Sequence, residues 1–138
     1  MSDLQRFVDA QDAGGTFDTA LAELRAGRKR SHWMWFVFPQ LAGLGRSETA
    51  QHYAVRDLAE ARAYLAHPVL GPRLLECARA LTALDTTDPV AVLGGIDAQK
   101  LHSSMTLFTW AAPSEPLFQE VLDRWFAGAP DPGTTSRL

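Results

Sequence analysis

The sequence predicts a mainly α, single compact domain of about six to eight short helices in an orthogonal arrangement. Apolar residues recur at three- and four-residue spacing in most segments, and candidate capping residues precede several of these segments. Alternation of apolar and polar residues, which would indicate half-buried strands, is scarce. The 138 residues, 46% of them hydrophobic, suit one domain that folds without a disulfide or a metal ion.

The first half of the chain is expected to form short helices that end at glycine or proline. We expect helices over residues 4–11, 16–26, 47–55 and 57–66. Thr16 is the expected N-cap of the second of these helices, and Gly27 is expected to end it. Asp57 and Glu60 have the spacing of a capping pair at the start of the fourth.

The second half predicts three further helices and a C-terminal tail. Residues 70–81 carry a continuous apolar stripe, and a brief turn from Asp88 leads to Gly94. Asp97 is the expected cap of a helix through residue 110, and Pro116 opens a helix that ends before Gly128. The expected domain therefore spans residues 1–128, and residues 129–138 form a tail that is loosely ordered or docked.

Residues 28–40 carry the strongest functional signal. Three cations and a histidine precede six consecutive apolar residues, Trp33 to Phe38, and no acid occurs from Leu24 to Ser47 although the net charge is -3. An apolar run of this length fits a buried strand or a buried helix, and we favour a helix because the neighbouring segments are helical. An aromatic wall beside a cationic rim predicts a pocket for a small anionic or nucleotide-like ligand.

Side chains of this segment are the first candidate site residues. His32 is a candidate acid or base, because adjacent cations and burial beside Trp33 would keep its imidazole neutral; alternatively, a backbone carbonyl satisfies it. Trp33 or Trp35 would stack a ligand ring, unless both only fill the core. Lys29 and Arg46 would contact the anion, although cations in this region also complement the dipole of the preceding helix.

A second polar group lies on the helix expected from Asp97. Lys100, Ser103 and Ser104 share one face at i, i+3 and i+4, where the lysine could activate a serine or hold an oxyanion; solvated surface is the alternative. The candidate catalytic residues are His32, Lys100 and Ser104. The candidate ligand-binding residues are Lys29, Trp33, Trp35, Gln40, Arg46, Tyr53 and Ser103. This hypothesis requires the aromatic segment and the serine-bearing helix to meet at one hollow.

Several classes of function are disfavoured. The longest apolar run falls far short of the ~20 residues that span a bilayer, and the N-terminus resembles no secretion signal. Cys77 is the single cysteine, so no internal disulfide forms, and we expect a cytoplasmic protein. The net negative charge disfavours general nucleic-acid binding. No motif indicates a metal or a cofactor. A non-catalytic module that binds a protein partner or forms a homodimer stays open as an alternative.

The central motifs resemble those of a bacterial family known as domain of unknown function 1810, whose members are sometimes labelled calpastatin. The resemblance rests on the run from Lys29 to Gln40, on Gly43, Gly45 and Ser47, and on the run from Ser103 to Phe108. Shorter matches from Tyr53 to Gly128 extend it over nearly the whole chain. It implies one mainly helical domain and no established activity. Nothing in these residues supports the calpastatin label, because calpain inhibitors of that kind are disordered repeats.

A weaker similarity is to NADAR-type proteins, small helical domains linked to ADP-ribose and N-glycosidic bond chemistry. It rests on the run from Thr49 to Tyr53 and on scattered matches near Glu60, Gly71 and Met105. Those proteins usually carry a Glu-His pair where this chain has Gln51 and His52. A glutamine can orient a ribose or a water molecule but takes up no proton. The similarity implies a NADAR-like activity as an alternative function.

Overall fold

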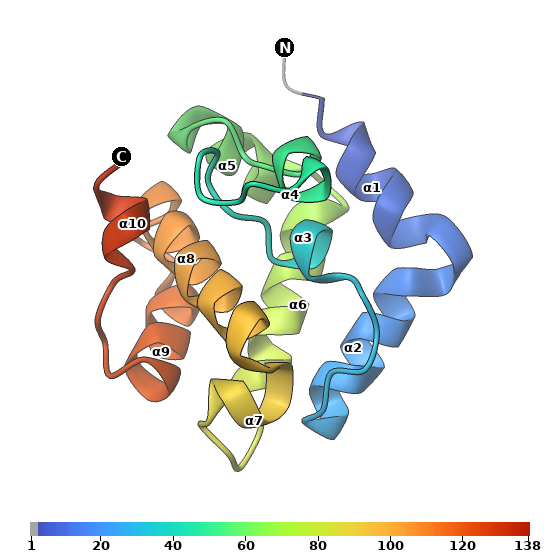
Figure 1. Cartoon of the computed structure of the whole chain (residues 1–138), viewed down its shortest axis with the longest axis vertical. Coiled ribbons are helices and arrows are strands. Elements are labelled where there is room, and N and C mark those ends of the chain that lie inside the picture. The colour runs from blue at the N-terminus through green and yellow to red at the C-terminus, as the bar shows by residue number, and fades with distance from the viewer. Residues whose placement is uncertain (1–2) are drawn as a thin grey trace.

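A computed structural model describes residues 3–138, which form a mainly helical domain, as predicted (Figure 1). In chain order the elements are α1 (Gln5–Asp12), the 3-10 helix η1 (Ala13–Gly15), α2 (Thr16–Ala26), α3 (Met34–Val37), α4 (Glu48–His52), α5 (Leu58–Ala66), α6 (Leu70–Thr82), α7 (Pro89–Leu93), α8 (Gly95–Ala111), α9 (Pro116–Trp125) and α10 (Pro132–Thr135). The short helices α7 and α10 were not among the helices expected from the sequence.

The long helix α8 organises the packing. It contacts α5, α7, α9 and α10, and α6 contacts α2, α5 and α9. Figure 1 shows α3 near the centre of the view, with α8 on one side and α1 and α2 on the other. A series of buried rings joins four helices: Phe7 contacts Tyr64 at 5.2 Å between centroids, Tyr64 contacts Phe108 at 5.4 Å, and Phe108 contacts Phe118 at 5.8 Å. This aromatic core holds the elements around α3 in place.

Most of the expected helix ends are present, and three differ. The helix expected through Val55 ends at His52, because Val55 pairs with Leu41 instead. The Ser47 Oγ accepts a hydrogen bond from Ala50 N, and the Asp57 Oδ1 accepts one from Glu60 N. Thr16 is the first residue of α2 rather than its N-cap, because Gly15 takes the cap position with φ 69°. Asp97 does not cap α8 either, because the helix already begins at Gly95. The Asp97 carboxylate is therefore free to contact side chains.

The aromatic segment forms a helix for one turn only. Helix α3 ends at Val37, and Phe38 leaves the helical region with φ -124° and ψ 73°. Pro39 explains this end, because the residue before a proline is disfavoured in the α region. Beyond it the chain is extended and forms an isolated parallel bridge between Leu41 and Val55, in which Val55 N donates to Gln40 O at 2.8 Å. Gln40 is thus placed by backbone pairing, outside the helix.

The C-terminal residues pack against α8. Asp131 and Thr134 are buried, and Asp131 N donates to Thr106 Oγ1 at 2.9 Å. Gln99 Nε2 donates to Asp131 Oδ1 at 3.0 Å, so a second residue of α8 holds the same turn. Figure 1 shows α10 alongside α8 at the edge of the molecule. Within residues 3–138, no helix combines the length and the apolar character needed to cross a membrane.

Candidate functional site

The loop between α2 and α3 is held by the Glu23 carboxylate. Glu23 Oε1 accepts hydrogen bonds from Arg30 N at 2.8 Å, Ser31 N at 3.0 Å and Trp33 Nε1 at 2.9 Å. Glu23 Oε2 accepts a bond from Ser31 Oγ at 2.6 Å. Burial alone would raise the pKa of Glu23, but these hydrogen bonds outweigh it and lower the pKa from 4.5 to about 2. Glu23 therefore fixes the backbone that carries Lys29 and His32.

The two tryptophans of the aromatic segment have different environments. Trp33 is 0% exposed, its indole N–H is bonded to Glu23, and its ring packs near Phe38. Trp33 is therefore a core residue, and its expected role as a stacking wall is wrong. Trp35 is only partly buried and lines a hollow at the surface. Of the two, Trp35 is the one that a ligand can reach.

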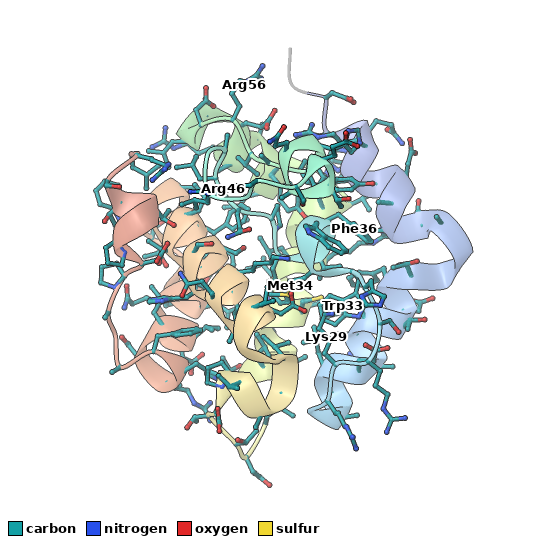
Figure 2. The ribbon with its side chains drawn as sticks, viewed as in Figure 1. Lys29, Trp33, Met34, Phe36, Arg46 and Arg56 are labelled. Carbon is teal, nitrogen blue, oxygen red and sulfur yellow. The ribbon has the colours of Figure 1, made fainter. Side chains whose placement is uncertain are left out.

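This hollow, which we call the cationic hollow, has a volume of about 470 Å³ and opens to solvent. It lies where α3 and the preceding loop face the end of α7 and the start of α8, and Figure 2 shows Lys29 and Met34 in this region. Its lining consists of Lys29, His32, Met34, Trp35, Leu93, Gly94, Gly95, Ile96, Asp97 and Lys100. Its size lies in the range of about 300–1,000 Å³ that is usual for small-molecule sites.

One carboxylate pairs with two lysines in the cationic hollow. Asp97 Oδ2 lies 2.8 Å from Lys29 Nζ, and Asp97 Oδ1 lies 3.6 Å from Lys100 Nζ. Lys100 Nζ also lies 4.7 Å from the centroid of the Trp35 ring. The three charged groups sum to one positive charge, and the N-terminus of α8 adds the partial positive charge of its dipole. The hollow can attract a small anion.

The serine-bearing helix does meet the aromatic segment. Gln40 Nε2 donates to Ser103 Oγ at 2.6 Å, and Ser103 Oγ donates to Lys100 O at 3.3 Å. However, Ser103 is 1% exposed and Ser104 is 0% exposed, and neither lines the cationic hollow. The expected catalytic role of Ser104 and direct ligand binding by Ser103 are therefore unsupported. The reason is that α8 packs against helices on several sides, which buries this face as well as the apolar one.

The other predicted residues lie apart from one another. His32 is exposed at the rim of the cationic hollow, so its expected burial beside Trp33 is wrong. Arg46 is exposed and does not line the hollow, and Figure 2 shows it away from Lys29. Tyr53 is partly buried against Phe36, with ring centroids 5.3 Å apart, and it also does not line the cationic hollow. The structure thus brings Lys29, His32, Trp35 and Lys100 together at the cationic hollow, which neither Arg46 nor Tyr53 lines.

Tyr53 belongs to a second hollow of about 550 Å³, which we call the aromatic hollow. Trp35, Phe36, Glu48, Thr49, His52 and Tyr53 line it. Trp35 is therefore shared by the two hollows. The sequence interpretation missed Glu48, although its i, i+4 spacing from His52 on a helix capped by Ser47 was a usable signal.

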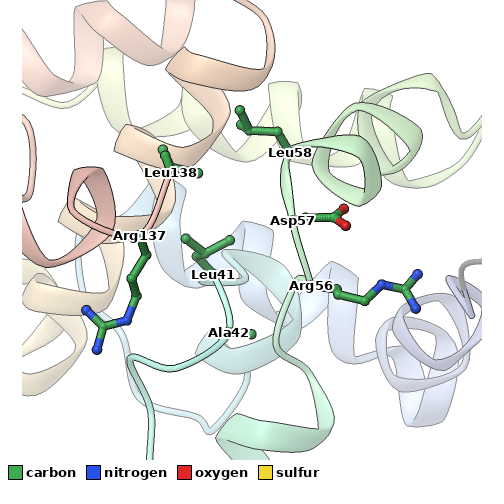
Figure 3. A pocket seen from close by; sticks show the side chains of 7 residues that line it. All are labelled: Leu41, Ala42, Arg56, Asp57, Leu58, Arg137 and Leu138. Atoms are coloured by element: carbon green, nitrogen blue, oxygen red, sulfur yellow. The ribbon is translucent and has the colours of Figure 1, made fainter.

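A third hollow, of about 280 Å³, lies beside the C-terminus (Figure 3). Its walls are mainly aliphatic, from Leu41, Leu58 and Leu138, and Figure 3 shows the charged ends of Arg56 and Arg137 directed away from them. The Asp57 carboxylate at its edge caps α5. This hollow offers few polar groups to orient a ligand. Among residues 3–138, no group of three or more histidine, cysteine or acidic side chains is placed to hold a metal ion.

Comparisons with known proteins agree with the fold. The family model described as "Protein of unknown function (DUF1810)" matches residues 1–138. A similar solved structure is that of the conserved hypothetical protein Rv1873 from Mycobacterium tuberculosis, with 46% sequence identity and a TM-score of 0.95 over 99% of this chain and 96% of that one. No curated protein matches the sequence. The chain therefore belongs to the family described as protein of unknown function (DUF1810).

Proposed function

We propose that the protein binds a small anionic ligand in the cationic hollow. The observation that carries this proposal is the pairing of two lysines, Lys29 and Lys100, with the single carboxylate of Asp97 beside the accessible Trp35 ring. A small anion would supply the missing negative charge and would contact the start of α8. The indole of Trp35 would pack against the uncharged part of the ligand.

The remaining polar groups fit supporting roles in this binding. Gln40 and Ser103 form a hydrogen-bonded link to the backbone carbonyl of Lys100, which fixes the turn of α8 that carries the ammonium group. His32 at the rim can donate a hydrogen bond to a bound anion. With Ser104 buried, no serine occurs among the described residues that line the cationic hollow, so we propose binding rather than catalysis there.

The test compares two cations that differ in position. Lys100→Met removes a positive charge from the cationic hollow, and Arg46→Met removes one from an exposed loop outside it. We expect wild-type protein to bind AMP or inorganic phosphate in isothermal titration calorimetry at physiological salt. Lys100→Met should weaken this binding by about tenfold, corresponding to one charge-assisted hydrogen bond. Arg46→Met should leave it nearly unchanged, because an exposed distant charge is screened.

Two outcomes would contradict the proposal. Equal losses in both variants would mean that net charge, and not the hollow, attracts the anion. No binding to the wild-type protein, together with a tight dimer in sedimentation, would favour the non-catalytic interaction module instead. The exposed side chains of Val90 and Ile96, at 57% and 77%, would then be the first candidates for that contact.

A second candidate function is NADAR-like processing of ADP-ribose or of another N-glycosidic bond. It is favoured by Glu48, which supplies the aromatic hollow with a carboxylate next to His52. Gln51 is unsuited to this role, because its amide donates to Arg46 O at 3.0 Å and takes up no proton. The test is chromatography of nucleotides and ADP-ribose after incubation with the protein, with Glu48→Gln as the inactive variant. Turnover that is unchanged in Glu48→Gln, or absent in the wild type, would contradict this candidate.

A further inference from the structure

The two hollows meet at one side chain, that of Trp35, which lines both. From this geometry we infer that the hollows are two subsites of a single groove that binds a nucleoside monophosphate. The phosphate lies in the cationic hollow, and the sugar and base lie across Trp35 in the aromatic hollow. This inference rests on the proposed function and adds the class of the ligand, its orientation and a second set of binding residues.

The aromatic hollow is lined by several aromatic side chains against which a planar ring could pack. The centroids of the Phe36 and Tyr53 rings lie 5.3 Å apart. The His52 ring contacts Tyr53 edge-on, with 4.6 Å between the centroids. Tyr53 also contacts the buried Phe7 at 5.9 Å, so the core supports this wall. Stacking on such rings contributes to affinity whichever nucleobase the ligand carries, because every base has a π-face.

Charge sets the orientation of the ligand. Glu48 is the one carboxylate among the residues that line the aromatic hollow, and the described lining there includes no lysine or arginine. An ionised carboxylate only accepts hydrogen bonds, so it suits the hydroxyls of a sugar or the amino group of a base and repels a phosphate. The phosphate therefore belongs at the other end, where Lys29 and Lys100 lie.

Charge also limits the number of phosphates. Lys29 and Lys100 share the carboxylate of Asp97, which leaves the cationic hollow with one positive charge before His32 is counted. A single phosphate is close to balance with this charge and with the partial charge at the start of α8. A triphosphate would carry several uncompensated negative charges into the site. The arrangement thus favours a monophosphate over a triphosphate.

The test uses a series of probes that adds one part of the ligand at a time. Calorimetric titration of the wild-type protein with inorganic phosphate, ribose 5-phosphate, AMP and ATP should show AMP binding at least about tenfold tighter than ribose 5-phosphate, as base stacking contributes. ATP should bind no tighter than AMP. AMP that binds no tighter than ribose 5-phosphate would overturn the inference and leave anion binding in the cationic hollow intact. Failure of every probe would overturn both.

Variants of the two hollows should separate the subsites. Glu48→Gln and Tyr53→Leu should each weaken AMP binding by about fivefold or more and leave phosphate binding unchanged. Lys100→Met should weaken both ligands by similar factors. Glu48 is exposed, so Glu48→Gln tests the assignment even if Tyr53→Leu fails to fold, which circular dichroism will show. If neither Glu48→Gln nor a folded Tyr53→Leu changes the ratio of AMP to phosphate affinity, the second subsite is wrong.

Discussion

Trp33 and Trp35 lie two positions apart and serve different parts of the molecule. Trp33 lies just before α3, is fully buried and donates its indole N–H to Glu23. Trp35 lies within the single turn of α3, is partly exposed and faces the ammonium group of Lys100. The comparison shows that one short segment contains both a buried anchor and a partly exposed ring that lines two hollows. Trp33 holds the loop that carries Lys29, and the Trp35 ring packs against the ammonium group of Lys100 at the hollow.

The largest expected effect on stability comes from removing the buried Trp33 side chain. Trp33→Ala should lower the free energy of unfolding by about 3–5 kcal/mol, because it leaves a large cavity in the core and removes a hydrogen bond to Glu23. Urea denaturation followed by circular dichroism measures this change. Trp33→Phe should lower the free energy of unfolding by less, since phenylalanine keeps most of the ring volume. Equal losses in Trp33→Ala and Trp35→Ala would contradict the division between the two tryptophans.

The next largest effect on stability is expected at Glu23, which accepts the hydrogen bond from the Trp33 indole. Glu23→Ala should lower the free energy of unfolding by about 1–3 kcal/mol, because the N–H groups of Arg30, Ser31 and Trp33 lose their acceptor. Glu120→Ala is the matched control, since Glu120 is exposed on α9. The same denaturation experiment applies to both variants. A loss in Glu23→Ala no larger than that in Glu120→Ala would show that the loop holds itself without the carboxylate.

The lowered pKa of Glu23 predicts that the stability of the protein depends on pH. The folded-state pKa of Glu23, about 2, lies below its ordinary value of 4.5, so its stabilising contribution is fully present above pH 4.5. This contribution is lost as the pH falls from 4.5 toward 2, because protonation of the carboxylate removes acceptors. The difference in unfolding free energy between the wild type and Glu23→Gln should therefore shrink over this window. A difference that stays constant from pH 5 to about pH 2.5 would contradict the proposed cause.

Local signals predicted the helices, whereas the roles of individual side chains depended on contacts between distant segments. Ser47 and Asp57 cap α4 and α5 as expected, because a cap requires only its own first turn. The expected accessibility of Ser104 failed, because the packing of α8 against several helices is set by the whole fold. The pairing of Lys29 with Asp97 joins segments that are far apart in the sequence, so no local pattern indicated it.

Trp33 and Trp35 also show that a local sequence pattern does not reveal which side chains are buried. Six consecutive apolar residues give no periodicity, so the sequence alone did not show which ring faces the core. The start of α3 at Met34 decides it, together with the acceptor that Glu23 offers to the indole of Trp33. The meeting of Gln40 with Ser103 agrees with the expected contact between the aromatic segment and the serine-bearing helix, but it occurs beneath the surface rather than at a ligand.

A smaller effect on stability is expected at Trp35. Trp35→Ala should lower the free energy of unfolding by about 1 kcal/mol, roughly half of the value for a fully buried large apolar side chain. It should weaken AMP binding much more clearly, because both hollows lose their shared wall. Denaturation and calorimetric titration of the same preparation give the two quantities. A folded Trp35→Ala protein with wild-type affinity for AMP would show that Trp35 contributes to neither subsite.

The smallest effect on stability should come from Asp97, and its effect on binding should have the opposite sign. Asp97→Asn removes the ion pairs with Lys29 and Lys100 but keeps an amide oxygen that can accept a hydrogen bond from an ammonium group, so we expect a loss of about 1 kcal/mol or less. It also leaves Lys29 and Lys100 without their shared counter-charge, so we expect phosphate to bind several-fold tighter, most clearly at low salt. Calorimetric titration at two salt concentrations measures this gain. If Asp97→Asn instead weakens phosphate binding, the carboxylate positions the lysines more than it competes with the anion, and the charge balance that selects a monophosphate would have to be abandoned.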